Sequence, residues 1–162
     1  MKRIAVFASG TGSNVANLIN HFHSHSAITL SLVVSNNSTA GALEKAELNN
    51  IPILILSKER VNDGEYIADE LNKNKIDFIV LVGYLKMIPS QLINQFKNKI
   101  INIHPSLLPK YSGKGMYGTV VHKAVCENKE TESGITIHFV NEEYDRGEII
   151  AQKKVSLIPA DT

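Results

Sequence analysis

One short segment of the chain combines an amide, an imidazole and two prolines at the end of an apolar run. It reads Asn102-Ile103-His104-Pro105-Ser106-Leu107-Leu108-Pro109. In a strand, Asn102 and His104 are two residues apart and therefore point to the same face. Pro105 favours an extended backbone at His104. An amide donor beside an imidazole, at the carboxyl end of a strand, is suited to stabilising an oxyanion. The alternative is a structural histidine whose hydrogen bonds are satisfied.

Three carboxylates lie in a polar loop further along the chain: Glu142, Glu143 and Asp145. One of them facing His104 would favour the protonated imidazole. Spacing alone does not choose among the three, and a solvated acidic turn is the alternative. We expect the carboxylate that acts to lie exposed on this loop.

A second candidate site is the glycine-rich loop Ser9-Gly10-Thr11-Gly12-Ser13-Asn14, between a predicted strand and a predicted helix. Its glycines allow a ligand close to the backbone, and the N–H groups of a helix start bind anions. Val15 stands where a dinucleotide-binding loop has its third glycine, and no acidic residue ends the second predicted strand. The Gly-Lys-Ser/Thr of a P-loop is also missing. We therefore favour a monophosphate site over a merely tight strand–helix turn.

The remaining histidines and the one cysteine indicate no metal site. Three histidines lie close together at the expected end of the first helix: His21, His23 and His25. No carboxylate or cysteine is near them, which favours solvated side chains over metal ligands. His122 and His138 fall inside helix and strand patterns and are expected to be structural. Cys126 has no second thiol with which to form a disulfide or a cysteine-based zinc site.

Strand-like and helix-like runs alternate along the chain. Short runs rich in β-branched residues predict seven strands, at Lys2–Ala8, Ile28–Val34, Ile53–Leu56, Phe78–Val82, Ile100–Ile103, Ile135–Val140 and Ile149–Leu157. Amphipathic stretches between them predict helices, although Asn62-Asp63-Gly64 could interrupt the third. Pro159–Thr162 is typical of the entry to a further helix. The pattern predicts an α/β fold with a doubly wound, mostly parallel central sheet and helices on both faces.

Composition excludes several classes of protein. The chain has 162 residues, 17 Lys and Arg against 16 Asp and Glu, and a formal net charge of +1. A chain of this length fits one domain, and we expect residues 1–162 to form it. The balanced charge argues against a general nucleic-acid binder. No apolar run is long enough for a secretory signal or a membrane span, so we expect a soluble, cytoplasmic protein.

Taken together, these motifs resemble those of the phosphoribosylglycinamide formyltransferases, a folate-dependent family of purine synthesis. The loop Ser9–Asn14 is similar to the family's phosphate loop, and Asn102–Pro109 to its catalytic strand end. Gly134–Gly147 is similar to its folate-side loop. The resemblance runs from Lys2 to Thr162 and implies a Rossmann-like formyltransferase fold, with a further helical segment beyond Thr162. The amino-terminal loop is what separates this family from its methionyl-tRNA formyltransferase relatives.

The resemblance implies three sets of site residues. The catalytic set is Asn102, His104 as general acid, and Asp145. The substrate phosphate is implied to be bound by Gly12, Ser13, Asn14, Val15 and Ala16. The folate is implied to contact Leu85, Lys86, Met87, Ile88, Asn102, Asn141, Glu142, Glu143, Tyr144 and Asp145. Lys86 stands where an arginine is more familiar in the family, and the Leu108–Pro109 peptide bond is implied to be cis.

The implied reaction transfers a formyl group from 10-formyltetrahydrofolate to the amine of glycinamide ribonucleotide (5′-phosphoribosylglycinamide), in de novo purine biosynthesis. The implied partners are these small molecules, without metal, nucleic acid or membrane, in a monomer or homodimer. One alternative is a 10-formyltetrahydrofolate hydrolase; such enzymes usually carry an additional amino-terminal domain, whereas the predicted sheet begins at Lys2. The other is a non-catalytic, flavodoxin-like module that binds a mononucleotide at Gly10–Asn14. That module would leave Asn102, His104 and Asp145 unexplained.

Overall fold

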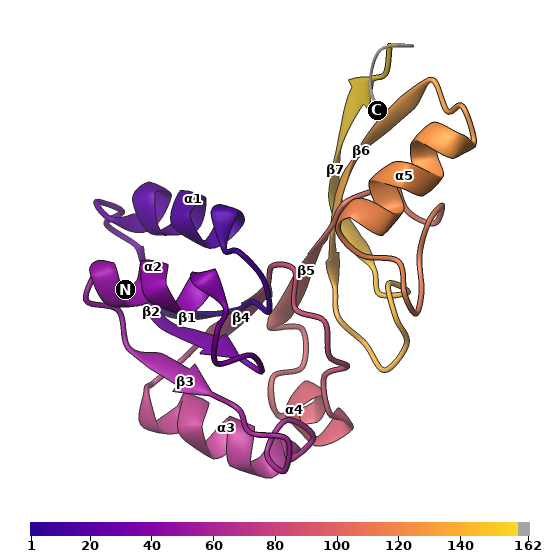
Figure 1. The fold of residues 1–162 in the computed structure, drawn as a ribbon. Coiled ribbons are helices and arrows are strands. Elements are labelled where there is room, and N and C mark those ends of the chain that lie inside the picture. The colour runs from indigo at the N-terminus through magenta and orange to yellow at the C-terminus, as the bar shows by residue number, and fades with distance from the viewer. Residues whose placement is uncertain (159–162) are drawn as a thin grey trace. The chain divides into compact units, whose positions relative to one another are not determined.

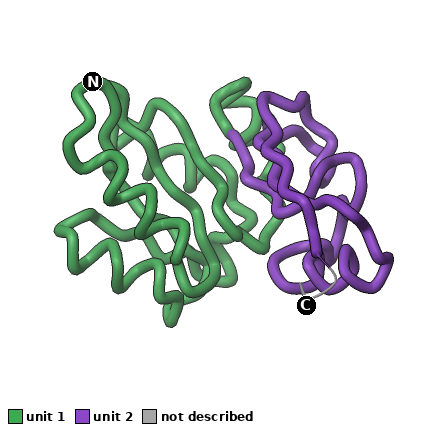
Figure 2. Tube along the Cα trace, turned by 90° about the horizontal axis from the view of Figure 1, so that it is seen from above, with its two compact units in different colours: residues 1–100 green, residues 101–162 purple. Residues whose placement is uncertain are grey.

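The computed structural model describes residues 1–158, and the chain divides into two compact units, residues 1–100 and residues 101–162 (Figure 2). The helix start predicted at Pro159–Thr162 lies outside the described residues. No helix among the described residues is long and apolar enough to cross a membrane.

The first unit is a parallel sheet with helices packed on it (Figure 1). Its strands are β1 (Lys2–Phe7), β2 (Ile28–Ser35), β3 (Ile53–Ile55) and β4 (Phe78–Leu81). Its helices are α1 (Ser13–Phe22), α2 (Gly41–Leu48), α3 (Gly64–Lys73) and α4 (Ser90–Gln95). The strands follow the order β3-β2-β1-β4, and every pairing is parallel. In Figure 1, α1 and α2 lie over one face, and α3 and α4 over the other.

The core of this unit is formed by the central strands, whose side chains are buried on both faces. In β1, Ala5, Val6 and Phe7 are fully buried, as are Val33 and Val34 of β2. Such continuous apolar strands are expected where helices cover both sides of a parallel sheet. The predicted strand boundaries agree with the observed ones to within one residue here.

Two local features of this unit differ from the sequence interpretation. Asp63-Gly64 does not interrupt α3 but begins it, because the Asp63 carboxylate caps the helix by accepting a hydrogen bond from Tyr66 N–H at 3.0 Å. The sequence patterns do not predict α4, which has only six residues. Leu92 is its one buried residue, so it carries no apolar stripe that a periodicity argument could detect.

The second unit holds an antiparallel sheet and one helix. It contains all but the first residue of β5 (Ile100–His104), together with α5 (Thr119–Glu127), β6 (Glu132–Phe139) and β7 (Ile149–Ser156). Strand β6 pairs antiparallel with both β5 and β7. The sequence predicts a sheet that is mostly, not wholly, parallel, and β6 is one of its antiparallel strands. Its burial alternates, with Thr136 and His138 buried and Ile135 43% exposed, as in antiparallel sheets that leave one face open.

Candidate active site

The second unit brings together the amide, the imidazole and one carboxylate predicted from the sequence. Asn102 and His104 point to the same face of β5, and both contact Asp145. Asp145 Oδ1 lies 3.4 Å from His104 Nδ1 and 3.4 Å from Asn102 Nδ2. Glu142 and Glu143 are exposed. The structure therefore selects Asp145 among the three carboxylates that spacing could not separate.

Asp145 is not the exposed loop carboxylate expected from the sequence. Its side chain is only 10% exposed. The residue adopts a left-handed backbone conformation with φ of 55°, which Asp and Asn tolerate better than most side chains. Its second oxygen, Oδ2, accepts a hydrogen bond from Gly113 N–H at 2.9 Å. The turn therefore directs the carboxylate inward, where it holds groups from three segments of this unit.

The surroundings of Asp145 determine its charge. Burial alone raises the pKa of this carboxyl, but hydrogen bonds from His104 and from the Gly113 N–H outweigh burial and hold the pKa well below its usual range. Asp145 is therefore ionised wherever the protein is folded near neutral pH. Its negative charge therefore lies beside His104 Nδ1, where the carboxylate can accept a hydrogen bond.

The contacts of His104 favour its protonated form. This side chain is 3% exposed, and its Nε2 lies 2.8 Å from the backbone carbonyl oxygen of Tyr111. A carbonyl only accepts, so Nε2 must carry a hydrogen. The other nitrogen, Nδ1, faces the Asp145 carboxylate, which also only accepts. Both nitrogens are satisfied at once only when both are protonated, so the geometry fits an imidazolium poised to donate a proton.

His138 is a member of this cluster that the sequence interpretation missed. It stands directly opposite Asn102 in the β5–β6 register, and only 2% of its surface is exposed. Its Nδ1 lies 2.8 Å from Phe139 O and therefore carries the hydrogen, which leaves Nε2 as an acceptor for Asn102 Nδ2 at 3.1 Å. Nε2 also lies 3.6 Å from Asp145 Oδ1. An alternating strand pattern does not reveal this role, because the partner depends on the antiparallel register.

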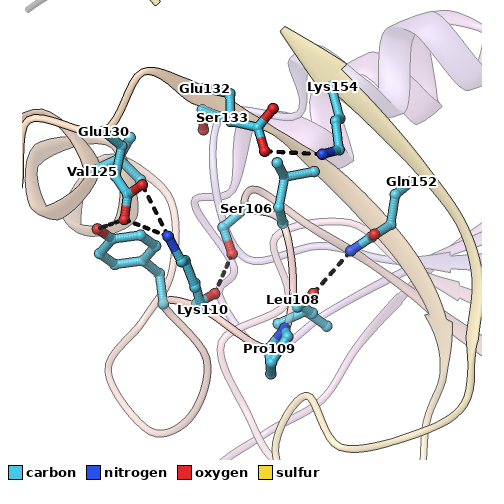
Figure 3. Close-up of a pocket in the computed structure, with 12 residues that line it drawn as sticks. Ser106, Leu108, Pro109, Lys110, Val125, Glu130, Glu132, Ser133, Gln152 and Lys154 are labelled. Atoms are coloured by element: carbon cyan, nitrogen blue, oxygen red, sulfur yellow. Dashed lines mark hydrogen bonds and ion pairs between the residues drawn. The ribbon is translucent and has the colours of Figure 1, made fainter. Parts of the chain in front are cut away.

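The loop after β5 is held in place by a buried threonine. Thr136 Oγ1 donates to Ser106 O at 2.7 Å and accepts from Leu108 N–H at 3.0 Å and from Gln152 Nε2 at 2.9 Å. Gln152 also donates to Leu108 O, and Ser106 Oγ donates to Lys110 O (Figure 3). These bonds fix the segment that begins two residues after His104. The predicted cis bond between Leu108 and Pro109 is confirmed.

A cavity of about 210 Å³ lies beside this loop, between α5 and the β6–β7 hairpin (Figure 3). The charged side chains around it pair with one another. Lys110 and the Tyr111 hydroxyl contact Glu130, while Lys154 contacts Glu132 at 2.9 Å. Because these charges are already matched, the lining supports the loop and presents no excess charge to a ligand.

In the first unit, the glycine-rich loop leads directly into α1. Gly12 is the helix cap, in a left-handed conformation with φ of 75°. Ser13 and Asn14 are exposed, and the first turn of α1 carries no acidic side chain. Val15 is fully buried, so it can offer a ligand only its backbone, and Ala16 N–H already donates to Gly12 O. The N–H groups at this helix start are therefore suited to an anion.

The structure gives a second reason for glycine at position 12, one that the sequence interpretation did not include. A Cβ at this position would lie 2.5 Å from Ala42 Cα at the start of α2. Glycine is thus required here by the packing of α1 against α2, whatever the loop binds. The expectation that Gly12 serves the close approach of a ligand is therefore incomplete.

The segment predicted to contact folate follows β4. Leu85 and Met87 are 45% and 46% exposed, Lys86 is exposed, and Ile88 is buried. Large apolar side chains that are this exposed are better suited to contact with a flat organic ring than to contact with water. In the second unit, the other predicted folate contacts, Asn141–Tyr144, form an exposed turn in which Asn141 Oδ1 accepts from Glu143 N–H.

No metal centre is evident in the described part of the chain, where no three His, Cys, Asp or Glu side chains gather in a way that could hold an ion. Of the three neighbouring histidines near the end of α1, His21 and His25 have contacts with each other, with Phe22 or with the backbone. His25 Nδ1 accepts from Ala27 N–H, and the His21 ring lies near Phe22 and His25.

Comparison with known proteins shows the family of the chain. A family model described as formyl transferase matches residues 2–162. The chain belongs to the formyltransferase family. It is 46% identical to a chloroplastic phosphoribosylglycinamide formyltransferase of Arabidopsis thaliana, over 99% of this chain and 57% of that protein. It is 38% identical to the Haemophilus influenzae phosphoribosylglycinamide formyltransferase, over 100% of this chain and 76% of that protein. The chain thus spans little more than half of the plant relative's length.

Solved structures of formyltransferases show the same fold. A phosphoribosylglycinamide formyltransferase from Anaplasma phagocytophilum aligns with a TM-score of 0.89 at 32% identity, over 99% of this chain and 74% of that one. A formyltetrahydrofolate deformylase from Pseudomonas syringae aligns with a TM-score of 0.85 at 26% identity, over 99% and 53%. The predicted α/β formyltransferase fold is therefore confirmed. The roles assigned to individual site residues stay predictions.

Proposed function

We propose that this formyltransferase chain transfers the formyl group of 10-formyltetrahydrofolate to the amine of glycinamide ribonucleotide, a step of purine synthesis. The observation that carries the proposal is the convergence of Asn102, His104 and Asp145 in the second unit. The names of the relatives from Arabidopsis and Haemophilus support the same substrate.

The chemistry proposed for His104 follows from its two contacts. The substrate amine attacks the formyl carbon, a carbon–nitrogen bond forms, and the carbonyl electron pair moves to oxygen. The imidazolium and the Asn102 amide would stabilise this oxyanion. Collapse of the tetrahedral intermediate expels the folate nitrogen, which takes a proton from His104 Nε2, while the attacking amine releases a proton to water, from which His104 is reprotonated. The Nε2–H of His104 must first break its hydrogen bond to the Tyr111 carbonyl, so we expect the loop at Tyr111 to move when substrates bind.

Asp145 and the first unit would have supporting roles. Asp145 would keep His104 protonated and oriented until the proton is needed. The start of α1 at Gly12–Asn14 would bind the ribose phosphate through its N–H groups, since a phosphate is attracted to the positive end of a helix. Leu85–Ile88 would contact the folate ring. The turn Asn141–Tyr144 would contact the folate from the second unit.

A formyl-transfer assay with and without glycinamide ribonucleotide tests the proposal. We expect folate turnover only when the ribonucleotide is present, and we expect His104→Ala to abolish it. Turnover without the ribonucleotide would instead identify a hydrolase, the second candidate, which the structural similarity to the deformylase favours. A flavin absorbance band in the purified protein would point to the mononucleotide-binding module.

Two further expectations belong to this proposal. We propose a cytoplasmic location, which fractionation tests; two plant relatives, at 46% and 43% identity, are named as chloroplastic. We also propose a monomer or homodimer without a metal, which sedimentation and metal analysis of active protein would test.

A further inference from the structure

Ser9 is a buried serine whose polar groups all point to other loops. It lies two residues after the end of β1 and is 6% exposed. Its N–H donates to Gly83 O at 3.1 Å, and its carbonyl accepts from Asn37 Nδ2 at 3.3 Å. Its hydroxyl donates to Asn36 Oδ1 at 2.6 Å and accepts from Leu85 N–H at 2.9 Å. One residue thus joins the segments that follow β1, β2 and β4.

These contacts divide into two kinds. The backbone bonds of Ser9, to Gly83 and Asn37, are available to any residue at this position. The hydroxyl bonds are specific to the side chain, and only they reach Leu85, the first residue of the predicted folate-binding segment. Three residues after Ser9, the same chain segment reaches Gly12 at the predicted phosphate site. The Ser9 hydroxyl therefore links the two predicted substrate-binding segments of the first unit.

We propose that Ser9 is a positioning residue that sets the folate-binding segment Leu85–Ile88 relative to the strand leading into the phosphate loop. This inference rests on the proposed function and adds a residue to its machinery. The hydroxyl fixes the Leu85 N–H, and the segment after it then presents the exposed side chains of Leu85 and Met87 in one arrangement. A segment held before the ligand arrives loses less conformational freedom on binding, which favours affinity.

The test compares Ser9→Ala with a matched control, Ser35→Ala. Ser35 is fully buried at the end of the neighbouring strand β2, and its hydroxyl accepts one hydrogen bond, from Asn37 N–H at 3.1 Å. It makes no contact with Leu85 among the bonds found in residues 1–158. Both variants remove a buried hydroxyl, but only Ser9→Ala releases the Leu85 N–H.

For Ser9→Ala we expect the KM for 10-formyltetrahydrofolate to rise about 5–10-fold, the effect of one hydrogen bond on binding. The kcat and the KM for glycinamide ribonucleotide should stay within about twofold, since the phosphate loop and His104 keep their own contacts. Amide hydrogen exchange at Leu85, measured by NMR, should accelerate in the same variant. Ser35→Ala should leave the folate KM and the Leu85 exchange rate unchanged.

A purely structural role gives a different result. Equal changes in both KM values and kcat, or a folate KM that rises as much in Ser35→Ala, would overturn the inference. If Ser9→Ala does not fold, Ser9→Cys keeps a side chain of similar shape with only weak hydrogen bonding and should show the same KM pattern. A wild-type chain that binds folate without transferring formyl defeats the proposed function alone, whereas an active chain with an unchanged folate KM in the variant defeats the role of Ser9 alone.

Discussion

The candidate sites of the two units are formed by different kinds of groups. In the first unit, the start of α1 presents backbone N–H groups at Gly12–Asn14, and no charged side chain belongs to that loop. In the second, Asn102, His104, His138 and Asp145 act through side chains that come from β5, β6 and a turn. A site formed by backbone N–H groups depends on one short, continuous segment of the sequence. A side-chain cluster exists only once strands are paired in the correct register.

This contrast predicts how each site responds to substitution. The candidate anion site at Gly12–Asn14 should tolerate side-chain substitutions that keep the start of α1 intact and add no negative charge. The cluster in the second unit is connected through one carboxylate, so removing that charge affects several groups at once. Buried polar networks of this kind lose more than one contact when one member is lost.

The largest expected effect is that of Asp145→Asn. Loss of the charge leaves His104 without its counterion, and kcat should fall about 10²–10⁴-fold, as for loss of general acid catalysis. Steady-state formyl-transfer kinetics measure this. Glu142→Gln and Glu143→Gln, on the same turn, are controls for kcat alone, which both should leave nearly unchanged because those side chains are exposed and do not contact His104; their folate KM is no control, because both are proposed folate contacts. A control as damaging as Asp145→Asn would show that the wrong carboxylate has been assigned.

The same variant should be less stable, in a way that depends on pH. The folded-state pKa of Asp145 is held below its ordinary value of 3.8. Its stabilising contribution is therefore complete well above that value and is lost as the pH falls through the lower, folded-state pKa. Urea unfolding at pH 7 should show Asp145→Asn to be less stable by about 1–3 kcal/mol. Below about pH 4 the gap should shrink; a gap that stays constant down to pH 2 contradicts the assignment.

A smaller effect is expected at His138. His138→Phe keeps a ring of similar shape but removes the acceptor of Asn102, so kcat should fall about tenfold, the loss of one hydrogen bond in the transition state. His138→Gln can still offer an acceptor and should recover part of that loss. If the two variants behave alike, His138 serves only packing.

The smallest expected effect lies in the first unit. Asn14→Asp places a negative charge at the proposed phosphate site, and the KM for the ribonucleotide should rise about fivefold, with the folate KM unchanged. Asn20→Asp makes the same change further along α1, at another exposed position, and is the control. Similar KM values for the ribonucleotide in both variants would show that this loop does not bind the phosphate.

Local patterns predict the first unit well and the second unit less well. The continuous apolar runs of β1 and β2 and the glycine cap of α1 are local signals, and the structure contains them where they are expected. The antiparallel course of β6 is not local. It depends on how the chain returns after α5, and the burial of Thr136 and His138, two residues apart in β6, is a feature of the structure.

The same reason explains the errors at the candidate site. The Asn102–His104 pair could be predicted because a strand fixes the direction of both side chains. The choice of Asp145 and its burial depended on a left-handed turn, and the role of His138 depended on its register opposite Asn102. The resemblance to a family indicated Asp145 without supplying its physical reason. His138 had no such support and was interpreted as structural.

The Thr136 hydroxyl limits which sequences this fold can use. A hydroxyl has one hydrogen to donate and two lone pairs to accept with, and here all three are used, by Ser106, Leu108 and Gln152. Valine has the same shape but would leave two groups of buried residues, the Ser106 carbonyl and the Leu108 N–H, without this partner. In a library randomised at this position and selected for folding, threonine and serine should dominate. The adjacent Ile135, 43% exposed, should accept many residues. Two neighbouring positions of one strand thus differ sharply in how much freedom evolution has to change them.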